Sequence, residues 1–487
     1  MNRDILDPAK NRAPETMRSV HLMGVGGVAM GALAAALKKQ GYQVRGSDRP
    51  LYPPMSTFLE QAQVPVLPGY RPEHLSPSPD LVIVGNVITA DNPEALELAR
   101  VGLPYLSLPQ ALAHFHLRHK IPIVVAGTHG KTTTTALVAS ALLAAGKRPG
   151  FMVGGLVGPD KLNFSPAVGE HFVVEGDEYD TAFFDKRPKF VHYLPRIGIL
   201  TSLEFDHADI YADLTAVRAA FAMLVSEIPA DGLLIAWGES DEVMAQAAKA
   251  ACRVETYGRH PQANWRLVGA EPAGDGGALV SIVTPDGQTV AVRSPLAGEH
   301  NALNLAAALA ALVASGLPVG QAARALESFP GVYRRQQVVG LVGGVTVVDD
   351  FAHHPTAVAE TIKALARFGA PGWNPAAGRL IAAFEPRSNT SRRNVFQAQY
   401  ATAFTGAARV YLREPALLEK IPTEDRFSSA RLALELNEAG IPARAFAAPD
   451  ELLQALLAEL KPGDCCLVMS NGGFDGLIEK LLQGLAS

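Results

Sequence analysis

Short apolar runs alternate with longer amphipathic or alanine-rich stretches along most of the chain, and this pattern predicts strands alternating with helices. The runs at 121–126, 379–384 and 464–470 are mainly apolar over the length of a strand, as expected for strands buried in a sheet. Between 265 and 294, apolar residues alternate with polar ones around two Asp-Gly turns, which predicts an antiparallel ribbon. The chain is therefore expected to be an α/β protein with open parallel sheets.

Two interruptions of this pattern predict the domain organisation. A polar, histidine-bearing stretch at 116–120 precedes the strand at 121–126, and a Pro/Gly turn followed by two arginines spans 329–335. The length of 487 residues is itself typical of about three domains. The predicted domains are residues 1–118, 119–333 and 334–487.

The first predicted domain carries a nucleotide-binding pattern. A strand at 19–24 runs into Gly24-Val-Gly26-Gly27 and then into a helix from about Ala29 to Gln40, and Asp48 ends the next strand. This is the dinucleotide fingerprint, in which the glycines let the backbone approach a pyrophosphate and the acid accepts hydrogen bonds from the ligand. Taken alone, the pattern is most typical of NAD, and glycine-rich turns also occur without a ligand.

The second predicted domain opens with a strand, the loop Gly127-Thr-His-Gly-Lys-Thr132 and a helix from about 133 to 145. This arrangement points backbone N–H groups at a phosphate, while Lys131 reaches the outer phosphates and the Thr132 hydroxyl holds Mg²⁺. Val125 stands where the strict P-loop pattern has its first glycine. The alternative, an ordinary glycine turn with a surface lysine, is disfavoured by the strand and helix on either side.

Acids follow two further predicted strands of this domain. Glu175 ends an apolar run and opens an acidic segment at 175–180, and a second strand end carries Glu204, Asp206 and His207. Ligands gather at the carboxyl ends of strands in α/β sheets, and carboxylate oxygens suit a hard cation such as Mg²⁺. The alternative for the acidic segment is a solvated turn. His207 beside Asp206 is a candidate metal ligand.

Polar side chains also mark three later segments. His300 and Asn301 lie on the first turn of a helix predicted from 298 to 314, where they either cap the helix or face a nucleotide. The two arginines of the 329–335 turn are placed where domains would hinge over a ligand. In the third predicted domain the strand ends are rich in Arg, Ser and Asn, as at 385–390, which suits a partner that bears carboxylates.

Composition and charge exclude several classes of protein. Hydrophobic residues make up 48% of the chain, which excludes wholesale disorder. The net charge of −5 comes without a block of like charge, so no nucleic-acid surface is predicted. The three cysteines show neither disulfide nor metal spacing, which indicates a reducing compartment. Without a signal peptide or a long apolar run, the chain is expected to be cytoplasmic and free of membrane spans.

In their order along the chain, these motifs resemble those of the Mur ligase family of bacterial peptidoglycan synthesis. The resemblance covers essentially the whole chain and rests on the segments 24–31, 127–133, 175–180, 204–207, 298–304, 334–335 and 349–355. It implies three α/β domains: a Rossmann-like UDP-binding domain, a P-loop ATPase domain and a Rossmann-like C-terminal domain. An NAD-dependent dehydrogenase or a P-loop motor would use one domain and leave the motifs of the other idle.

The resemblance implies an ATP-dependent carbon–nitrogen ligase that uses Mg²⁺. Such an enzyme joins the lactyl carboxylate of UDP-N-acetylmuramate to an amine through an acyl phosphate. The acceptor stays open between L-alanine, used in de novo synthesis, and the tripeptide L-Ala-γ-D-Glu-meso-diaminopimelate, used in peptidoglycan recycling. The segments 175–180, 184–189, 351–352 and 385–390 favour the tripeptide. Small molecules are the expected partners, and the chain is expected to be a monomer or a weak homo-oligomer.

The resemblance also assigns roles to individual residues. It gives catalytic roles to Lys131, His207 and Glu175, and metal-binding roles to Thr132, Glu175 and His207. The residues implied for ATP are Gly127, Thr128, His129, Gly130, Lys131, Thr132, Thr133, His300, Asn301, Arg335 and Asp350. Those implied for the UDP-sugar are Gly24, Gly26, Gly27, Asp48 and Asn86. Those implied for the peptide are Arg387, Ser388, Asn389, Ser470 and Asn471.

Overall fold

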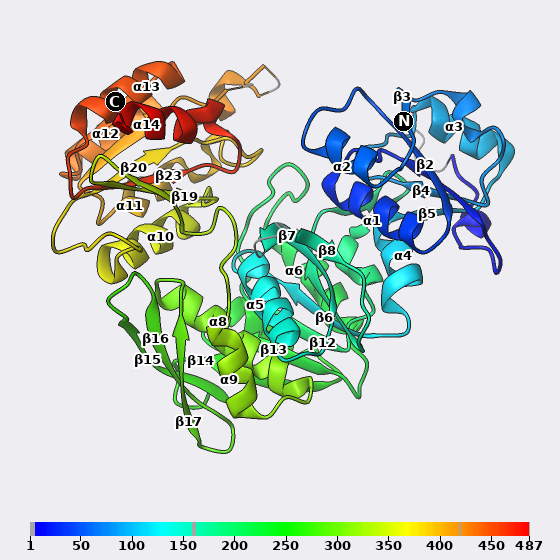
Figure 1. Ribbon diagram of the computed structural model, residues 1–487, viewed down its shortest axis with the longest axis horizontal. Coiled ribbons are helices and arrows are strands. Elements are labelled where there is room, and N and C mark those ends of the chain that lie inside the picture. The colour runs from blue at the N-terminus through cyan, green and yellow to red at the C-terminus, as the bar shows by residue number, and fades with distance from the viewer. Residues whose placement is uncertain (1–4, 158–161, 417, 420, 487) are drawn as a thin grey trace.

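The computed structural model describes residues 5–486 apart from 158–161, 417 and 420. Three units follow one another, each on its own sheet: the N-terminal unit (19–112), the central unit (121–327) and the C-terminal unit (337–486). In Figure 1 the N-terminal and C-terminal units lie on either side above the central unit. The predicted boundaries at 118 and 333 fall in the segments that join the units, and they stay predictions. The outermost predicted residues, 1–4 and 487, lie outside the described part.

The N-terminal unit is built on a parallel five-stranded sheet. Its strands, in spatial order, are β3 (Val66–Pro68), β2 (Gln43–Asp48), β1 (Ser19–Met23), β4 (Leu81–Val84) and β5 (Tyr105–Ser107). Its helices are α1 (Val28–Lys39), α2 (Met55–Gln61), α3 (Pro93–Val101) and α4 (Leu108–Leu112). The predicted strands and helix around the glycine-rich turn are confirmed as β1, β2 and α1. The turn follows β1, where the strand order reverses, and open α/β sheets bind ligands at such a point.

The central unit is built on a ten-stranded sheet. In spatial order the strands are β17 (Thr289–Ser294), β16 (Ala278–Val283), β15 (Trp265–Pro272), β14 (Arg253–Gly258), β13 (Leu233–Trp237), β12 (Ile197–Leu200), β6 (Ile121–Ala126), β9 (His171–Gly176), β7 (Gly150–Val157) and β8 (Leu162–Ser165). The strands from β15 to β7 are parallel, whereas β15, β16 and β17 form the predicted antiparallel ribbon. A separate hairpin, β10 (Asp180–Ala182) and β11 (Asp185–Pro188), follows β9.

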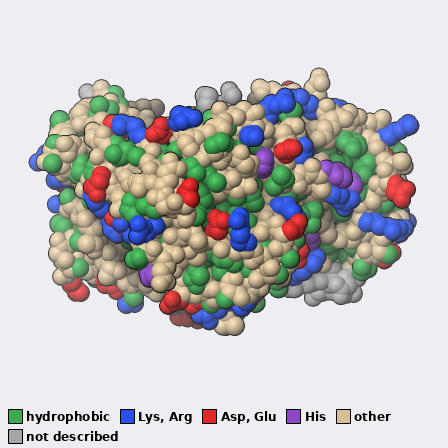
Figure 2. Space-filling view, turned by 90° about the horizontal axis from the view of Figure 1, so that it is seen from below, with side chains coloured by type: hydrophobic (Ala, Val, Ile, Leu, Met, Phe, Trp, Pro, Cys, Tyr) green, Lys and Arg blue, Asp and Glu red, His purple; other side chains and the backbone are tan. Residues whose placement is uncertain are grey.

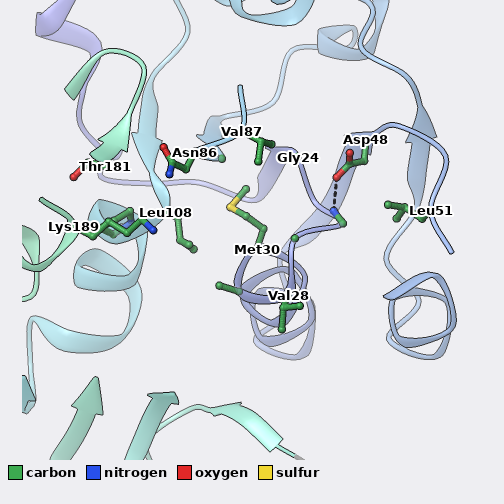
Figure 3. Close-up of a pocket in the computed structure, with 15 residues that line it drawn as sticks. Gly24, Val28, Met30, Asp48, Leu51, Asn86, Val87, Leu108, Thr181 and Lys189 are labelled. Atoms are coloured by element: carbon green, nitrogen blue, oxygen red, sulfur yellow. Dashed lines mark hydrogen bonds between the residues drawn. The ribbon is translucent and has the colours of Figure 1, made fainter. Parts of the chain in front are cut away.

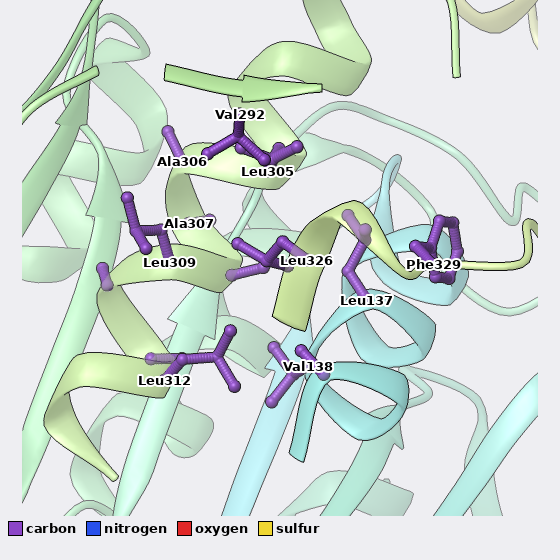
Figure 4. Packing of buried hydrophobic residues seen from close by; sticks show 14 of the residues in the cluster. Leu137, Val138, Val292, Leu305, Ala306, Ala307, Leu309, Leu312, Leu326 and Phe329 are labelled. Atoms are coloured by element: carbon purple, nitrogen blue, oxygen red, sulfur yellow. The ribbon is translucent and has the colours of Figure 1, made fainter. Parts of the chain in front are cut away.

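The helices of the central unit are α5 (Lys131–Ala144), α6 (Leu214–Ser226), α7 (Asp241–Ala247), α8 (Glu299–Ala314) and α9 (Val319–Glu327). Figure 4 shows how α5, α8 and α9 pack through Leu137, Leu309 and Leu326, which are at most 1% exposed. Val125, at the position of the first P-loop glycine, is also fully buried in this core. Its side chain therefore has a packing role, which accounts for the departure from the strict pattern.

The C-terminal unit has a six-stranded sheet, ordered β18 (Gln337–Val342), β19 (Val345–Asp350), β23 (Cys465–Met469), β20 (Leu380–Phe384), β21 (Arg409–Arg413) and β22 (Ala443–Phe446). Its helices are α10 (Pro355–Phe368), α11 (Gln397–Ala403), α12 (Ser429–Glu438), α13 (Pro449–Glu459) and α14 (Leu477–Ala486). The expected open parallel sheet is confirmed from β19 to β22, and β18, a strand that was not predicted, pairs antiparallel with β19. The two strands are joined by the tight turn Gly343-Gly344, and a parallel pair needs a much longer crossover.

The surface carries charges of both signs. On the face shown in Figure 2, basic and acidic side chains are interspersed rather than gathered into one block. Within the described ranges, the helices are too short or too polar to cross a lipid bilayer.

Candidate active site

The loop at 127–132 leaves the carboxyl end of β6 and leads into α5. Gly127 and Gly130 have φ angles of +139° and +80°, which other residues rarely adopt. A Cβ atom on Gly130 would lie 2.5 Å from Oδ1 of Asn304, so the close approach of α8 also requires glycine there. α5 begins at Lys131 without a side-chain cap. Its first backbone N–H groups are therefore available to an anion.

The neighbouring strand end holds this loop. Oγ1 of Thr128 accepts the backbone N–H of Glu204 at 2.9 Å, and the backbone N–H of His129 donates to Oγ of Ser202 at 2.8 Å. Thr133, which is also implied for ATP, is 6% exposed and lies within α5. Because β6 and β12 are adjacent and parallel, the two strand ends meet at one edge of the sheet.

Lys131 lies folded over the loop. Its Nζ donates to the carbonyl of Gly127 at 2.5 Å and to the carboxylate of Glu178 at 3.0 Å. Burial alone would lower the pKa of Lys131, but the negative charges of Glu178 and Glu175 outweigh burial and raise it. The ammonium group therefore stays charged, as needed to stabilise phosphate oxygens.

Thr132 and Glu175 meet beside this lysine. Oγ1 of Thr132 donates to Oε1 of Glu175 at 2.9 Å, and Oε2 of Glu175 accepts the N–H of Gly154 at 2.6 Å. Burial raises the pKa of Glu175, and the charge of Lys131 opposes that rise. A hydroxyl and a carboxylate in contact are oxygen ligands of the kind that Mg²⁺ takes, so this pair fits the metal-binding role. The third predicted ligand, His207, contacts a different acid.

That acid is Glu178, to which the sequence assigns no individual role. Its side chain is 3% exposed and lies between Lys131 and His207, whose Nε2 is 2.9 Å away. Burial would lower the pKa of His207, but the hydrogen bond and charge of Glu178 raise it. His207 also has a φ of +56°, and such strained residues cluster at functional sites. The acidic segment at 175–180 was the available signal, but the sequence does not say which acid turns inward.

Arg335 joins the loop from the hinge between units. Its Nη2 donates to Oγ1 of Thr132 at 3.4 Å, and its guanidinium lies 5.1 Å from the ring centroid of Phe351. Asp350 accepts the backbone N–H of Gln336 at 2.7 Å and is 4% exposed. Arg335 therefore faces the phosphate loop, whereas Asp350 fixes the backbone of the hinge.

The two residues of α8 that are predicted to contact ATP differ in their exposure to solvent. His300 is 31% exposed, and its Nδ1 lies 3.7 Å from Oε2 of Glu360 on α10. Asn301 is 5% exposed and donates to the carbonyl of Ala297 at 2.8 Å. His300 can therefore reach a ligand, whereas Asn301 stabilises the start of α8.

His129, Glu204 and His354 form a group that the sequence does not predict. One potential ligand atom from each lies within 4.8 Å of the others, and Oε2 of Glu204 is 3.5 Å from Nε2 of His129. Burial lowers the pKa of His354 to about 4. The backbone N–H of Thr356 donates to Nδ1 of His354 at 3.3 Å, so the neutral ring carries its proton on Nε2. In this tautomer neither ring nitrogen of His354 has a free lone pair for a metal. We therefore interpret the group as a polar contact between the central and C-terminal units.

A pocket of about 420 Å³ opens at the glycine-rich turn of the N-terminal unit (Figure 3). It is lined by the residues predicted for UDP, namely Gly24, Gly26, Gly27, Asp48 and Asn86. Asp48 accepts the N–H of Gly26 at 2.7 Å and the hydroxyl of Tyr70 at 3.0 Å, so its carboxylate also holds the turn in place. Thr181 and Lys189 of the central unit line the same pocket, which the sequence does not predict.

A second hollow, of about 350 Å³, lies between the central and C-terminal units. From the central unit, Asp206 and His207 line it, and from the C-terminal unit Arg387, Ser388, Asn389 and Asn471 do so. Ser470 does not line this hollow. It is 1% exposed, and its hydroxyl donates to Glu385 at 2.6 Å. The structure thus brings four of the predicted peptide-binding residues together and gives Ser470 a structural contact.

Three profiles of one family match successive parts of the chain. "Mur ligase family, catalytic domain" matches residues 19–120, "Mur ligase middle domain" matches 125–312, and "Mur ligase, glutamate ligase domain" matches 334–472. Together they cover well over half of the sequence.

Individual relatives align over nearly the full length. The UDP-N-acetylmuramate–L-alanyl-gamma-D-glutamyl-meso-2,6-diaminoheptandioate ligase of Escherichia coli (strain K12) is 41% identical, covering 96% of this chain and 98% of that protein. The UDP-N-acetylmuramate–L-alanine ligase of Renibacterium salmoninarum is 35% identical over 96% of each chain. The crystal structure of a murein peptide ligase from Psychrobacter arcticus is 34% identical with a TM-score of 0.67, covering 97% of this chain and 99% of that one.

Proposed function

The chain belongs to the Mur ligase family, and from this membership we propose that it joins UDP-N-acetylmuramate to the tripeptide L-Ala-γ-D-Glu-meso-diaminopimelate at the expense of ATP. The new amide bond forms between the lactyl carboxylate of the muramyl nucleotide and the amine of the tripeptide. The reaction returns peptides from the cell wall to peptidoglycan synthesis. The higher identity to the tripeptide ligase, 41% against 35% for the alanine ligase, favours this acceptor.

The observation that carries the proposal is the hollow shared by the central and C-terminal units. His207 and Asp206 line it beside the phosphate loop, and Arg387 and Asn389 line it from the opposite unit. An acceptor bound against the arginine would therefore present its amine close to the group activated at the loop. Such positioning converts an encounter of two substrates into a reaction within one complex.

Residues of the loop act on ATP. The free N–H groups at the start of α5 and the Lys131 ammonium bind the phosphates and stabilise the charge that develops during transfer to the lactyl carboxylate. Arg335 adds a second cation from the hinge. Attack by the amine on the resulting acyl phosphate then releases phosphate.

Thr132 and Glu175 would hold Mg²⁺, because they offer a hydroxyl and a carboxylate in contact at the phosphate loop. When bound, Mg²⁺ neutralises charge on the phosphate oxygens. His207 keeps its predicted role as a ligand of a second metal only if Glu178 releases Nε2 or if Nδ1 is used, since Glu178 already holds Nε2. Glu178 otherwise orients this ring toward the hollow.

The acceptor test is phosphate release from ATP and Mg²⁺ with UDP-N-acetylmuramate. We expect the tripeptide to give a kcat/KM at least about a hundred-fold above that of free L-alanine. A site built to pair several carboxylates discriminates against L-alanine, which bears a single one and is too short to reach the others' partners. A preference for L-alanine would mean that the enzyme makes the de novo precursor. Release that depends on neither acceptor would refute the ligase proposal.

Replacing Arg387 by alanine should separate the two substrates. Arg387 is 41% exposed in the hollow, and its paired N–H donors suit a carboxylate of the tripeptide. We expect the KM for the tripeptide to rise about ten-fold or more, because charge-assisted hydrogen bonds contribute about 1.5–3 kcal/mol, with little change in the KM for UDP-N-acetylmuramate.

The matched control is Arg431→Ala, since Arg431 is a 67% exposed arginine paired with Glu435 on α12, away from the hollow. This variant should retain both KM values. Equal losses for the two substrates in Arg387→Ala would contradict the peptide-binding role.

The proposal also covers the setting of the enzyme. We propose that the enzyme acts in the cytoplasm as a monomer or a weak homo-oligomer, with domains at 1–118, 119–333 and 334–487. Each boundary lies in a segment between two sheets.

A further inference from the structure

The hairpin β10–β11 belongs to the central unit but is anchored on the N-terminal one. Phe183, at the tip of the hairpin, is 7% exposed and packs in one cluster with Val84 of β4 and Tyr105 of β5. The ring of Phe184 lies 5.0 Å from that of Tyr105, edge to face. The hairpin therefore holds a fixed place on the N-terminal sheet, and so do the residues that flank it.

Two of those residues reach the nucleotide pocket. Thr181 and Lys189 line it, and Figure 3 shows both at the side away from Asp48. The side chain of Lys189 is 17% exposed. The central unit therefore forms part of the wall of this pocket, although the glycine-rich turn belongs to the N-terminal unit.

Charge makes Lys189 distinctive within this pocket. Of the described residues that line it, only Asp48 and Lys189 are charged, and Asp48 is negative. A muramyl nucleotide carries a diphosphate and a lactyl carboxylate, all anionic at neutral pH. The start of α1 offers partial positive charge to such a ligand, and Lys189 offers a full one.

Lys189 is also bound to the acidic segment after β9. Its Nζ donates to Oδ2 of Asp177 at 2.7 Å. Although burial alone would raise the pKa of Asp177, the charge and hydrogen bond of Lys189 lower it. An ammonium group has three donors, so Lys189 can keep this bond while it donates to a ligand.

We propose that Lys189 is a substrate-positioning residue that pairs with an anionic oxygen of the muramyl nucleotide and, through Asp177, ties the nucleotide pocket to the acids beside the phosphate loop. The inference rests on the proposed function, which supplies the ligand. The anionic oxygen belongs either to the diphosphate or to the lactyl carboxylate, and binding measurements distinguish these sources. In either case, the residue links the bound sugar to the unit that activates its carboxylate.

The test is calorimetric titration of the full chain with UDP, UDP-N-acetylglucosamine and UDP-N-acetylmuramate. We expect Lys189→Ala to weaken binding about ten-fold or more, as for loss of a charge-assisted hydrogen bond. A loss for all three ligands assigns the contact to the diphosphate. A loss for UDP-N-acetylmuramate alone assigns it to the lactyl carboxylate. Both outcomes support the proposal, and unchanged affinity for every ligand overturns it.

Two further variants separate a local effect from damage to the fold. Lys186→Ala removes a 45% exposed lysine of the same hairpin, paired with Asp180 outside the pocket lining, and should bind all three ligands like the parent protein. Lys189→Arg retains the charge and should recover part of the lost affinity. A role based on charge would be contradicted if Lys189→Arg recovered none of the lost affinity while its unfolding temperature stayed unchanged. If the parent protein binds none of the three nucleotides, the proposed function itself fails.

Discussion

Replacing Lys131 by alanine is expected to lower the turnover of ligation by about 10²–10³-fold or more, the size of effect seen when one preorganised charge-stabilising group is removed. Lys131 is the cation at the start of α5, held over the loop by the carbonyl of Gly127 and by Glu178. Without it, the charge that develops on the phosphate oxygens loses its nearest partner in a site shielded from water. The measurement is ATP- and acceptor-dependent phosphate release at saturating substrates, with the unfolding temperature recorded alongside.

The matched control for this variant is Lys147→Ala. Lys147 is an exposed lysine just beyond the far end of the same helix. Its removal should leave turnover and folding unchanged. Near-normal turnover in Lys131→Ala would contradict the assignment of the loop at 127–132 to ATP.

Replacing Glu178 by glutamine is expected to lower turnover by about 10²-fold, because misplacement of catalytic groups by about 1 Å can have effects of that order. The Glu178 carboxylate is 3.0 Å from Nζ of Lys131 and 2.9 Å from Nε2 of His207, and it is 3% exposed. Glutamine keeps the size of the side chain but neutralises neither cation. The pKa of His207, which Glu178 raises, should fall, and the acidic limb of the pH–rate profile should move to lower pH if His207 must be neutral.

Asp180→Asn provides the comparison within the same acidic segment. Asp180 is 30% exposed and pairs with Lys186 at 2.8 Å, and such surface pairs contribute little. The Asp180→Asn variant should therefore keep nearly full turnover. Equal behaviour of the two variants, with either a loss or no loss in both, would contradict a specific role for Glu178.

Local patterns in the sequence predicted much of the fold. The strand, loop and helix around 127–132 were confirmed as β6 and α5, because buried apolar runs and glycine breaks act over a few residues. The antiparallel ribbon of β15 to β17 was confirmed for the same reason. The strand β18 was not predicted, and the two-glycine turn at 343–344 sets its antiparallel direction.

The candidate site was predicted as segments, but its contacts were not. Gly24, Gly26 and Gly27 line one hollow, Arg387, Ser388 and Asn389 line the other, and residues 127–132 form the loop before α5. Their roles toward ligands stay predictions. Two other predicted site residues, Asn301 and Ser470, are buried, and their side chains donate to groups of the protein itself. A polar residue at a strand or helix end has the same signature in the sequence whether it faces a ligand or its own backbone.

The sequence by itself determined the α/β class, the phosphate loop and the glycine-rich turn, because each depends on residues close together along the chain. Only the tertiary structure decided that Glu178 lies between Lys131 and His207, and that Lys189 enters a pocket of another unit. These contacts depend on the order of β6, β9 and β12 in the sheet and on the anchoring of Phe183. The packing of distant apolar surfaces sets that order, so the spacing of residues along the chain does not reveal it.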